Sequence, residues 1–268
     1  MSALIGVTSS LLTRYQQLFD LTGKRVVLFG AANGIGRECA YALAAHGATV
    51  LTADRDESAL QDLATTLGHG SEAAEVDLLD PEAIQDYAAA VGPVDALVFT
   101  PAINIRKRID AYTDAEFAQV VDLNLMASFR LVRAFAPLIA ANGGGSIVGF
   151  SSIRAVTVEP GQGAYAATKA GMEMLLRTAA SEFGSENVRA NAIRPGVVET
   201  SLTAQLRGNE AWNQAYADKS ALGRWAKPSE LAGAVVFLVS DASTFVTGSV
   251  LTVDGGWTAQ DGRFDPPM

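Results

Sequence analysis

The sequence has very few residues of the kinds that carry disulfide, thiol or metal chemistry. Its 268 residues include one cysteine, Cys39, and two histidines, His46 and His69. A single cysteine cannot form an internal disulfide, which fits a reducing compartment. The residues around Cys39 indicate a helix, so a small buried side chain is favoured over a reactive thiol. No cluster of histidine, cysteine and carboxylate residues has metal-ligand spacing, so we expect no catalytic metal.

Positive charge is also scarce. The chain has 20 basic and 29 acidic residues, a net charge of −9, which repels nucleic-acid phosphates and anionic lipids. The short basic cluster 106–108 is typical of a solvated loop, although a local role beside a polar substrate stays open. The sequence shows no signal-peptide pattern and no run of about 18 apolar residues. We therefore expect a cytoplasmic protein that binds neither nucleic acid nor membrane.

What the sequence does have is a regular alternation of short apolar runs with longer amphipathic stretches. Such alternation is typical of a parallel β-sheet whose strands are joined by helices. Runs such as 26–29 and 96–99 are apolar at successive positions, as expected when helices cover both faces. We predict a single-domain α/β fold, a doubly wound parallel sheet of seven strands. The strands are expected at Arg25–Gly30, Ala48–Ala53, Glu72–Asp77, Val94–Phe99, Gly145–Ser151, Asn187–Arg194 and Ser249–Val253.

Two segments lie outside this alternation. Residues 1–20 precede the first strand and are expected to form an arm, which leaves 21–268 as the domain. The stretch 199–227 lacks a strand pattern and carries three aromatic residues, Trp212, Tyr216 and Trp225. We interpret it as a helical insertion that covers a site.

A glycine-rich turn directly follows the first expected strand and opens a helix. Its glycines allow a tight turn and a close approach of the backbone to a pyrophosphate, which then lies at the helix N-terminus. Three spaced glycines alone are a weak signal, but the order of strand, turn and helix strengthens it. The residues expected at this pyrophosphate site are Gly30, Asn33, Gly34, Ile35 and Gly36.

Acidic residues end the second and third expected strands. Asp54 is placed to accept hydrogen bonds from a ribose 2′-hydroxyl and to repel a 2′-phosphate, which favours NAD over NADP. Arg55 beside it keeps NADP open, although an arginine can equally lie against the adenine or face water. Asp77, followed by Leu78, is placed at the adenine edge, where a solvated strand end is the alternative interpretation.

Tyr165 and Lys169 lie four residues apart in the expected helix 164–180, so both side chains project from one face. A neighbouring ammonium and a cationic nicotinamide favour the phenolate, which lets a tyrosine exchange a proton with an alcohol. Ser152 follows the fifth expected strand and can hydrogen-bond the substrate oxygen. Asn124 is a polar residue in the apolar helical stretch 115–140 and needs a partner, and a water between it and Lys169 would extend a proton path.

With these motifs, residues 18–258 resemble the short-chain dehydrogenase/reductase family. The glycine-rich turn, the acidic end of strand two, Asn124, Ser152, Tyr165 and Lys169 follow the family's order and spacing. The resemblance implies a Rossmann fold, a nicotinamide cofactor, a secondary alcohol or ketone as substrate, and a homotetramer. It also implies that four residues after strand six hold the nicotinamide: Pro195, Gly196, Val198 and Thr200.

The chain departs from the family pattern at two places. Phe29 stands where threonine is usual, and Phe99–Ala102 replaces an Asn-Asn-Ala-Gly run that shapes the cofactor floor. Weaker similarities around 103–107 and 151–154 point to gluconate 5-dehydrogenases and related sugar-acid or polyol dehydrogenases. Salt bridges within loops explain the arginines of these segments equally well. The residues expected near such a substrate are Arg106, Arg154, Glu159 and Gln162.

Three other functions compete with an NAD-dependent dehydrogenase of sugar acids or polyols. An NADPH-dependent ketoreductase of acyl or aromatic ketones is the main alternative, and cofactor preference separates the two. A non-catalytic nucleotide-binding regulator is disfavoured because the tyrosine and lysine are both present. A Ser-His-Asp hydrolase is disfavoured because 149–153 lacks the closing glycine of a nucleophile elbow.

Overall fold

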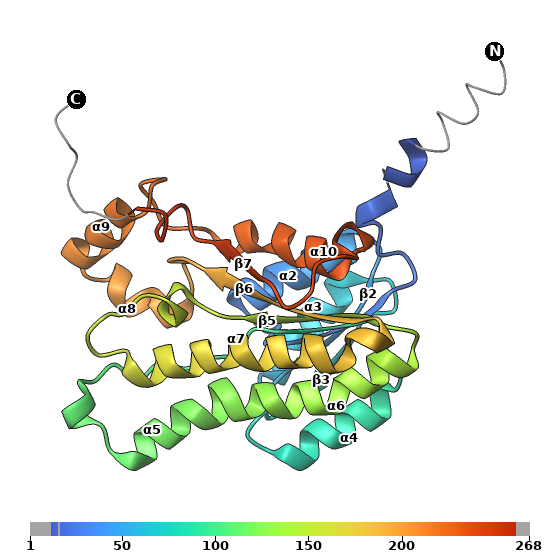
Figure 1. Ribbon diagram of the computed structural model, residues 1–268, viewed down its shortest axis with the longest axis horizontal. Coiled ribbons are helices and arrows are strands. Elements are labelled where there is room, and N and C mark those ends of the chain that lie inside the picture. Colours follow the sequence, from blue (N-terminus) through green and yellow to red (C-terminus); the bar gives the residue numbers. More distant parts are fainter. Residues whose placement is uncertain (1–11, 16, 261–268) are drawn as a thin grey trace.

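A computed structural model describes residues 12–15 and 17–260, in which seven parallel strands form one sheet in the order β3-β2-β1-β4-β5-β6-β7 (Figure 1). The doubly wound parallel sheet predicted from the sequence is therefore confirmed. The strands are β1 (Arg25–Phe29), β2 (Thr49–Asp54), β3 (Glu72–Glu75), β4 (Ala96–Phe99), β5 (Gly145–Phe150), β6 (Val188–Pro195) and β7 (Val250–Val253). The main helices are α2 (Gly34–Ala45), α3 (Glu57–Leu67), α4 (Pro81–Val91), α5 (Asp114–Val121), α6 (Ala127–Ala141), α7 (Gly163–Phe183), α8 (Ala204–Arg207), α9 (Glu210–Lys219) and α10 (Ala232–Val239).

The ends of the strands differ from the prediction by one or two residues. β3 ends at Glu75, so Asp77 lies in the loop after the strand, while β6 extends to Pro195. The expected arm 1–20 is described only from Leu12, apart from position 16. A short 3-10 helix, η1 (Gln17–Phe19), leads from it into the domain.

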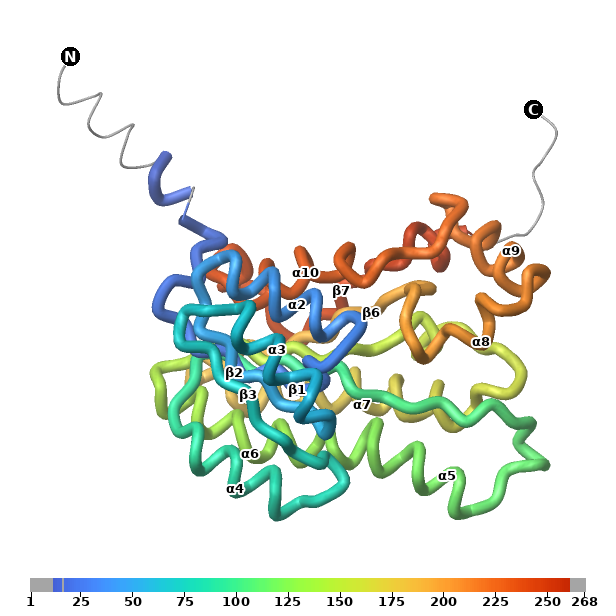
Figure 2. The backbone as a smooth tube through the Cα atoms, turned by 180° about the vertical axis from the view of Figure 1, so that it is seen from behind, coloured from blue at the N-terminus to red at the C-terminus, as the bar shows by residue number. Residues whose placement is uncertain are grey.

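Two hydrophobic cores lie on opposite faces of the sheet. Successive strand residues point to opposite faces, so Val27 and Phe29 join the core under α4, α6 and α7. Val26 and Leu28 join the other core, under α2, α3 and α10. Figures 1 and 2 show these two helical layers from opposite sides. Burial on both faces explains why β4, and β1 from Val26 onward, are apolar at every position.

One continuous helix runs from Asp114 to Ala141 and is long and apolar enough to cross a membrane. In this fold it is a core helix: α6 contacts α4, α7 and β5, and Leu131, Phe135 and Ile139 are buried in the core. The sequence did not reveal that its middle, Asp122–Met126, forms a π-helical turn, η3. This turn contains Asn124.

The stretch 199–227 contains a 3-10 turn, η6 (Ser201–Thr203), followed by α8 and α9. These two helices lie together at one end of the molecule, on the left in Figure 1. A small third core joins them to the rest of the domain, with Trp225 and Trp257 buried and Tyr216 packed against them. Two of the three aromatic residues noted in the sequence, Tyr216 and Trp225, thus hold this covering segment in place, whereas Trp212 is exposed.

We predict that Phe29, the residue that departs from the family pattern, is a stability determinant. Its fully buried ring packs edge-on against Tyr87 and Phe135, each with a centroid distance of 5.7 Å. Phe29→Ala should lower the free energy of unfolding by about 3–5 kcal/mol, measured by urea denaturation. Phe245→Ala, at a fully exposed ring, should change it by less than about 0.5 kcal/mol. A loss below about 1 kcal/mol at Phe29 would contradict this assignment.

Candidate active site

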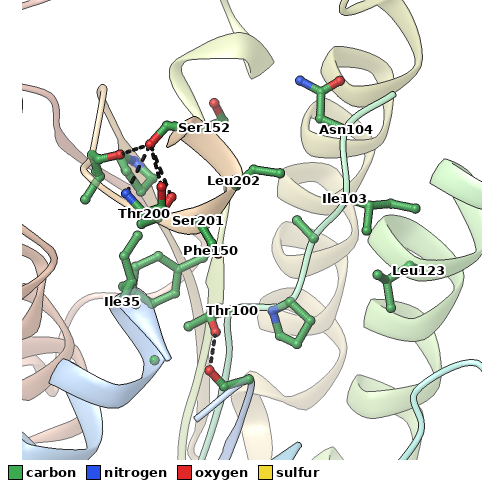
Figure 3. A pocket seen from close by; sticks show the side chains of 18 of the residues that line it. Ile35, Thr100, Ile103, Asn104, Leu123, Phe150, Ser152, Thr200, Ser201 and Leu202 are labelled. Carbon is green, nitrogen blue, oxygen red and sulfur yellow. Dashed lines mark hydrogen bonds between the residues drawn. The ribbon is translucent and has the colours of Figure 1, made fainter. Parts of the chain in front are cut away.

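A cavity of about 390 Å³ opens where the strands end at their carboxyl edge. Figure 3 shows it between the loop that carries Ile103 and Asn104 and the segment that carries Thr200–Leu202. The structure brings nearly all of the predicted site residues to its wall. Those lining it are Gly30, Asn33, Gly34, Ile35, Gly36, Asp54, Arg55, Asp77, Leu78, Arg106, Ser152, Arg154, Gln162, Tyr165, Lys169, Pro195, Gly196, Val198 and Thr200.

The glycine-rich turn forms a tight cradle at one end of the cavity. Gly30 has φ +85°, and a Cβ there would lie 2.3 Å from Thr100 Oγ1. A Cβ on Gly36 would lie 2.0 Å from the carbonyl oxygen of Gly30, so only glycine allows this approach of backbone to backbone. The helix α2 begins at Gly34 and directs its free N–H groups at the cavity. This cradle fits a dinucleotide pyrophosphate.

The substituted run after β4 supports this cradle by a different contact. Thr100 donates its hydroxyl to the carbonyl oxygens of Phe29 and Gly30, at 3.3 and 3.2 Å. Its backbone N–H also bonds to Phe29. The departure at 99–102 therefore keeps the floor of the cavity attached to the end of β1.

The two predicted acidic residues lie at the cofactor end of the cavity. Asp54 accepts a hydrogen bond from the Ala32 N–H at 3.1 Å, which ties its carboxylate to the glycine-rich turn. Asp77 accepts from the Leu79 N–H at 2.9 Å and lines the same wall. Both carboxylates are thus held in place by backbone groups where a ribose and an adenine can reach them.

Ser152, Tyr165 and Lys169 meet at the other end of the cavity. The Ser152 hydroxyl lies beside Tyr165 and acts to lower the Tyr165 pKa. The Lys169 ammonium lies 5.8 Å from the centre of the Tyr165 ring and donates to the Phe150 carbonyl oxygen at 2.6 Å. Lys169 is 2 % exposed, and this burial lowers its pKa from 10.5 to about 8.

Without a cofactor, the surroundings of Tyr165 do not favour its phenolate, which the sequence analysis expected from a neighbouring ammonium together with a cationic nicotinamide. Burial raises the pKa of Tyr165, and the opposing effects of Ser152, Arg154 and Arg106 do not outweigh it. Arg154 and Arg106 supply positive charge that acts to lower the pKa. The contribution expected from a cationic nicotinamide stays a prediction.

The side chain of Asn124 is hydrogen-bonded to the loop after β4. Its Oδ1 accepts from the Ile103 N–H at 2.9 Å, and its Nδ2 donates to the Ile103 carbonyl at 2.9 Å and to Thr168 at 3.2 Å. Both amide N–H groups are thereby used, and the side chain does not line the cavity. The side chain of Asn124 therefore positions the loop after β4, and the water predicted between Asn124 and Lys169 stays a prediction.

The predicted substrate residues form one polar cluster around Glu159. Its carboxylate pairs with Arg106 at 2.9 Å and with Arg154, and it accepts from Gln162 at 2.7 Å. Both arginines and Gln162 line the cavity, but Glu159 lies behind them and does not. In the sequence analysis, salt bridges within loops and contact with a substrate were alternative roles for the arginines. In the structure, Arg106 and Arg154 form the salt bridges and also line the cavity.

Sequence reasoning missed four contributors to this site. Tyr216 of α9 donates its hydroxyl to Glu159, and Asn104 donates to Gln162 at 2.9 Å. The other two, Glu173 and Arg194, form a buried ion pair at 2.7 Å. The Ser151 hydroxyl also donates to Glu173 at 2.6 Å, which links the ends of β5 and β6 to α7. Only the position of Glu173 one helical turn after Lys169 hinted at this link.

Comparisons with known proteins agree with this geometry. A family model described as enoyl-(acyl carrier protein) reductase matches residues 30–258. Galactitol 2-dehydrogenase (L-tagatose-forming) of Cereibacter sphaeroides is 37 % identical over 91 % of this chain and 98 % of its own. Gluconate 5-dehydrogenase of Gluconobacter oxydans is 32 % identical over 91 % and 98 %.

A solved structure shows the same fold. Gluconate 5-dehydrogenase of Burkholderia cenocepacia, in complex with NADP and tartrate, superposes with a TM-score of 0.86 at 32 % identity, over 91 % of this chain and 98 % of that one. The match to the family model, residues 30–258, extends from the glycine-rich turn to the segment after β7. The chain therefore belongs to the short-chain dehydrogenase/reductase family of NAD(P)-dependent oxidoreductases.

Proposed function

We propose that this protein interconverts a secondary alcohol and a ketone on a small hydroxy acid or polyol, with NAD as the preferred cofactor. The observation that carries the proposal is the arrangement of one cavity wall. Tyr165, with Ser152 beside it, lines the same cavity as Arg106 and Arg154. A proton carrier and an anchor for polar substrate groups thus face a single cleft.

The chain's own residues divide the acid-base work. Tyr165 takes the alcohol proton in oxidation and returns it in reduction. Ser152 holds the reacting oxygen beside the phenol, and Lys169 is placed to bind the nicotinamide ribose. When bound, the nicotinamide supplies the hydride-transfer chemistry. Lys169, Tyr165 and the Pro195–Gly196 loop all line this cavity, which supports these roles.

The substrate class follows from the polar wall and from the relatives. Arg106 and Arg154 can donate hydrogen bonds to a carboxylate or to hydroxyl groups. Asn104 Oδ1 is buried and accepts no hydrogen bond from any residue that the structure describes, an acceptor that a substrate hydroxyl could satisfy. Related proteins are named for galactitol and gluconate. These points support a sugar acid or polyol over the alternative of acyl or aromatic ketones.

The preference for NAD rests on Asp54. Its carboxylate is fixed at the end of β2 by the Ala32 N–H, and a second phosphate on the ribose would bring negative charge against it. A solved relative binds NADP, and Arg55 lines the same part of the cavity. NADPH-dependent ketone reduction is therefore the second candidate.

We further propose a homotetramer in the cytoplasm. Support for assembly comes from the outer face of α5 to α7, where Phe117, Phe129 and Met174 are exposed, and from the small residues of α7. Ala166, Ala167 and Ala170 would allow close packing of a second copy, whereas Gly171 faces Leu125 of the same chain, 3.4 Å from where a Cβ would lie. The single buried cysteine and the net negative charge fit the cytoplasm.

Tyr165→Phe should lower turnover by about two to four orders of magnitude, because the variant keeps the ring and loses only the proton carrier. NADH should still bind, as judged by its fluorescence. Tyr41→Phe, whose hydroxyl accepts from Arg37 outside the cavity, should keep near-normal turnover. The readout is absorbance of the reduced cofactor with a panel of sugar acids, polyols and cyclic alcohols. Near-normal turnover of the Tyr165→Phe variant would reject the role of the phenol.

The buried Lys169 should give a pH-dependent contribution to stability in the protein without cofactor. Its folded-state pKa of about 8 lies below the ordinary 10.5, so between these values the unfolded chain binds the extra proton. The free energy of unfolding of the natural protein, relative to Lys169→Met, should therefore rise as the pH increases from 8 to 10.5. Urea denaturation at several pH values measures this difference. A flat or falling difference would mean that Lys169 is not a lysine with a depressed pKa.

Asp54→Ala should shift the ratio of kcat/KM for NAD over NADP by about tenfold or more towards NADP, because it removes the negative charge beside the ribose site. Asp62→Ala, at an exposed position of α3, should leave the ratio unchanged. Initial rates with both cofactors give the ratio. A strong NADP preference in the unaltered protein would reverse the interpretation of Asp54.

A further inference from the structure

We propose that Glu159 is a specificity-determining residue. It neutralises one of the two positive charges of the substrate wall, the part of the cavity lined by Arg106 and Arg154. This wall therefore has a net charge of +1 and selects substrates with one carboxylate. The inference rests on the proposed function, in which Arg106 and Arg154 face the substrate. It assigns the choice among neutral polyols, hydroxy monoacids and hydroxy diacids to a residue that does not itself touch the cavity.

The hydrogen bonds to Glu159 occupy its acceptor capacity. Oε1 accepts from Arg106 at 2.9 Å and from Tyr216 at 2.6 Å, while Oε2 accepts from Gln162 at 2.7 Å and from Arg154. A carboxylate offers about four lone-pair positions, so little capacity remains for a ligand. Burial acts to raise the pKa of Glu159, but the hydrogen bonds from Tyr216 and Arg106 outweigh it, so the pKa is lowered. Glu159 is therefore an ionised partner of the arginines.

Each arginine keeps donors that Glu159 does not use. Arg154 bonds to Glu159 through Nη2 and Arg106 through Nη1. Their remaining guanidinium nitrogens have no hydrogen-bond partner among the described residues. These nitrogens are not fully buried either, because the buried side-chain atoms without a partner in the described residues are Asn104 Oδ1 and Arg207 Nε only. Since both arginines line the cavity, these free donors are available to a ligand.

The position of the cluster is fixed from several sides. The Arg154 guanidinium lies 5.7 Å from the Trp257 ring centre and 6.0 Å from that of Tyr216. Tyr216 in turn stacks on Trp225 at 5.5 Å. The Arg154 side chain is only 9 % exposed, so its charge is weakly screened by water. The cluster is therefore a preorganised anion site rather than a mobile surface pair.

The charges of this wall determine what it binds best. Two guanidinium groups and one carboxylate leave a net charge of +1. One substrate carboxylate neutralises it, whereas a second carboxylate meets no free cation and loses its hydration. A neutral polyol leaves the +1 charge unpaired. The other basic residues of this loop, Lys107 and Arg108, pair with Glu116 and Asp110 and do not line the cavity. Asp54, Arg55 and Asp77 lie at the cofactor end.

Glu159→Gln tests the inference, because it removes the charge and keeps the shape and most of the hydrogen bonds. We expect kcat/KM for an aldarate relative to an aldonate of the same chain length to rise about tenfold, and the aldonate-to-alditol ratio to rise as well. Binding of tartrate relative to glycerate to the enzyme–NADH complex, measured by calorimetry, should shift in the same direction. Glu116→Gln, which removes a paired carboxylate outside the cavity and keeps a helix-capping side chain, should change neither ratio.

Ratios that change by less than about twofold in Glu159→Gln would overturn the inference. If that variant does not fold, Arg106→Gln tests the inference instead. It lowers the net charge of the substrate wall to zero and should therefore move both substrate ratios in the opposite direction. Unchanged ratios in Arg106→Gln would also overturn the inference. Turnover of hydroxy compounds with unchanged ratios would leave the proposed function standing without this inference. A shifted tartrate-to-glycerate ratio without turnover of any alcohol would reject the proposed function and keep the anion site.

Discussion

The parallel direction of all seven strands is the constraint on which the rest of this structure depends. Because every strand ends at the same edge of the sheet, the loops after β1, β2, β4, β5 and β6 converge there. The chain moves outward from β1 to β2 and β3 and then returns to β4 on the other side of β1, which opens a crevice at the reversal. Residues more than 150 positions apart, such as Gly30 and Thr200, thereby line one cavity.

Burial has opposite consequences at the two catalytic side chains on α7. It lowers the pKa of Lys169 and raises that of Tyr165, so both groups are biased towards their neutral forms in the protein alone. Positive charge near Tyr165 acts against this bias. Arg106 and Arg154 act to lower the Tyr165 pKa, which couples the proton carrier electrostatically to the residues proposed to bind the substrate.

The Glu173–Arg194 ion pair and the Glu159 cluster illustrate two uses of a carboxylate near a cleft. Glu173 ties α7 to the ends of β5 and β6, directly behind the catalytic side chains. Glu159 instead joins the loops after β4 and β5 to the covering helix α9 through Arg106, Arg154 and Tyr216. The first holds the reaction centre in position, and the second gives the substrate wall its charge.

The sequence by itself determined the parallel sheet, the glycine-rich turn and the Tyr165–Lys169 pair, because each depends on local spacing: successive apolar residues, a strand-turn-helix order, or one helical turn. Tertiary structure alone decided the rest. The π-helical turn directs Asn124 to the backbone of Ile103, and burial sets the pKa of Tyr165 against the effect expected from a neighbouring lysine. The partners of Glu159 come from positions 106 to 216, a separation that no local pattern encodes, since charge pairing depends on distance in space rather than along the chain.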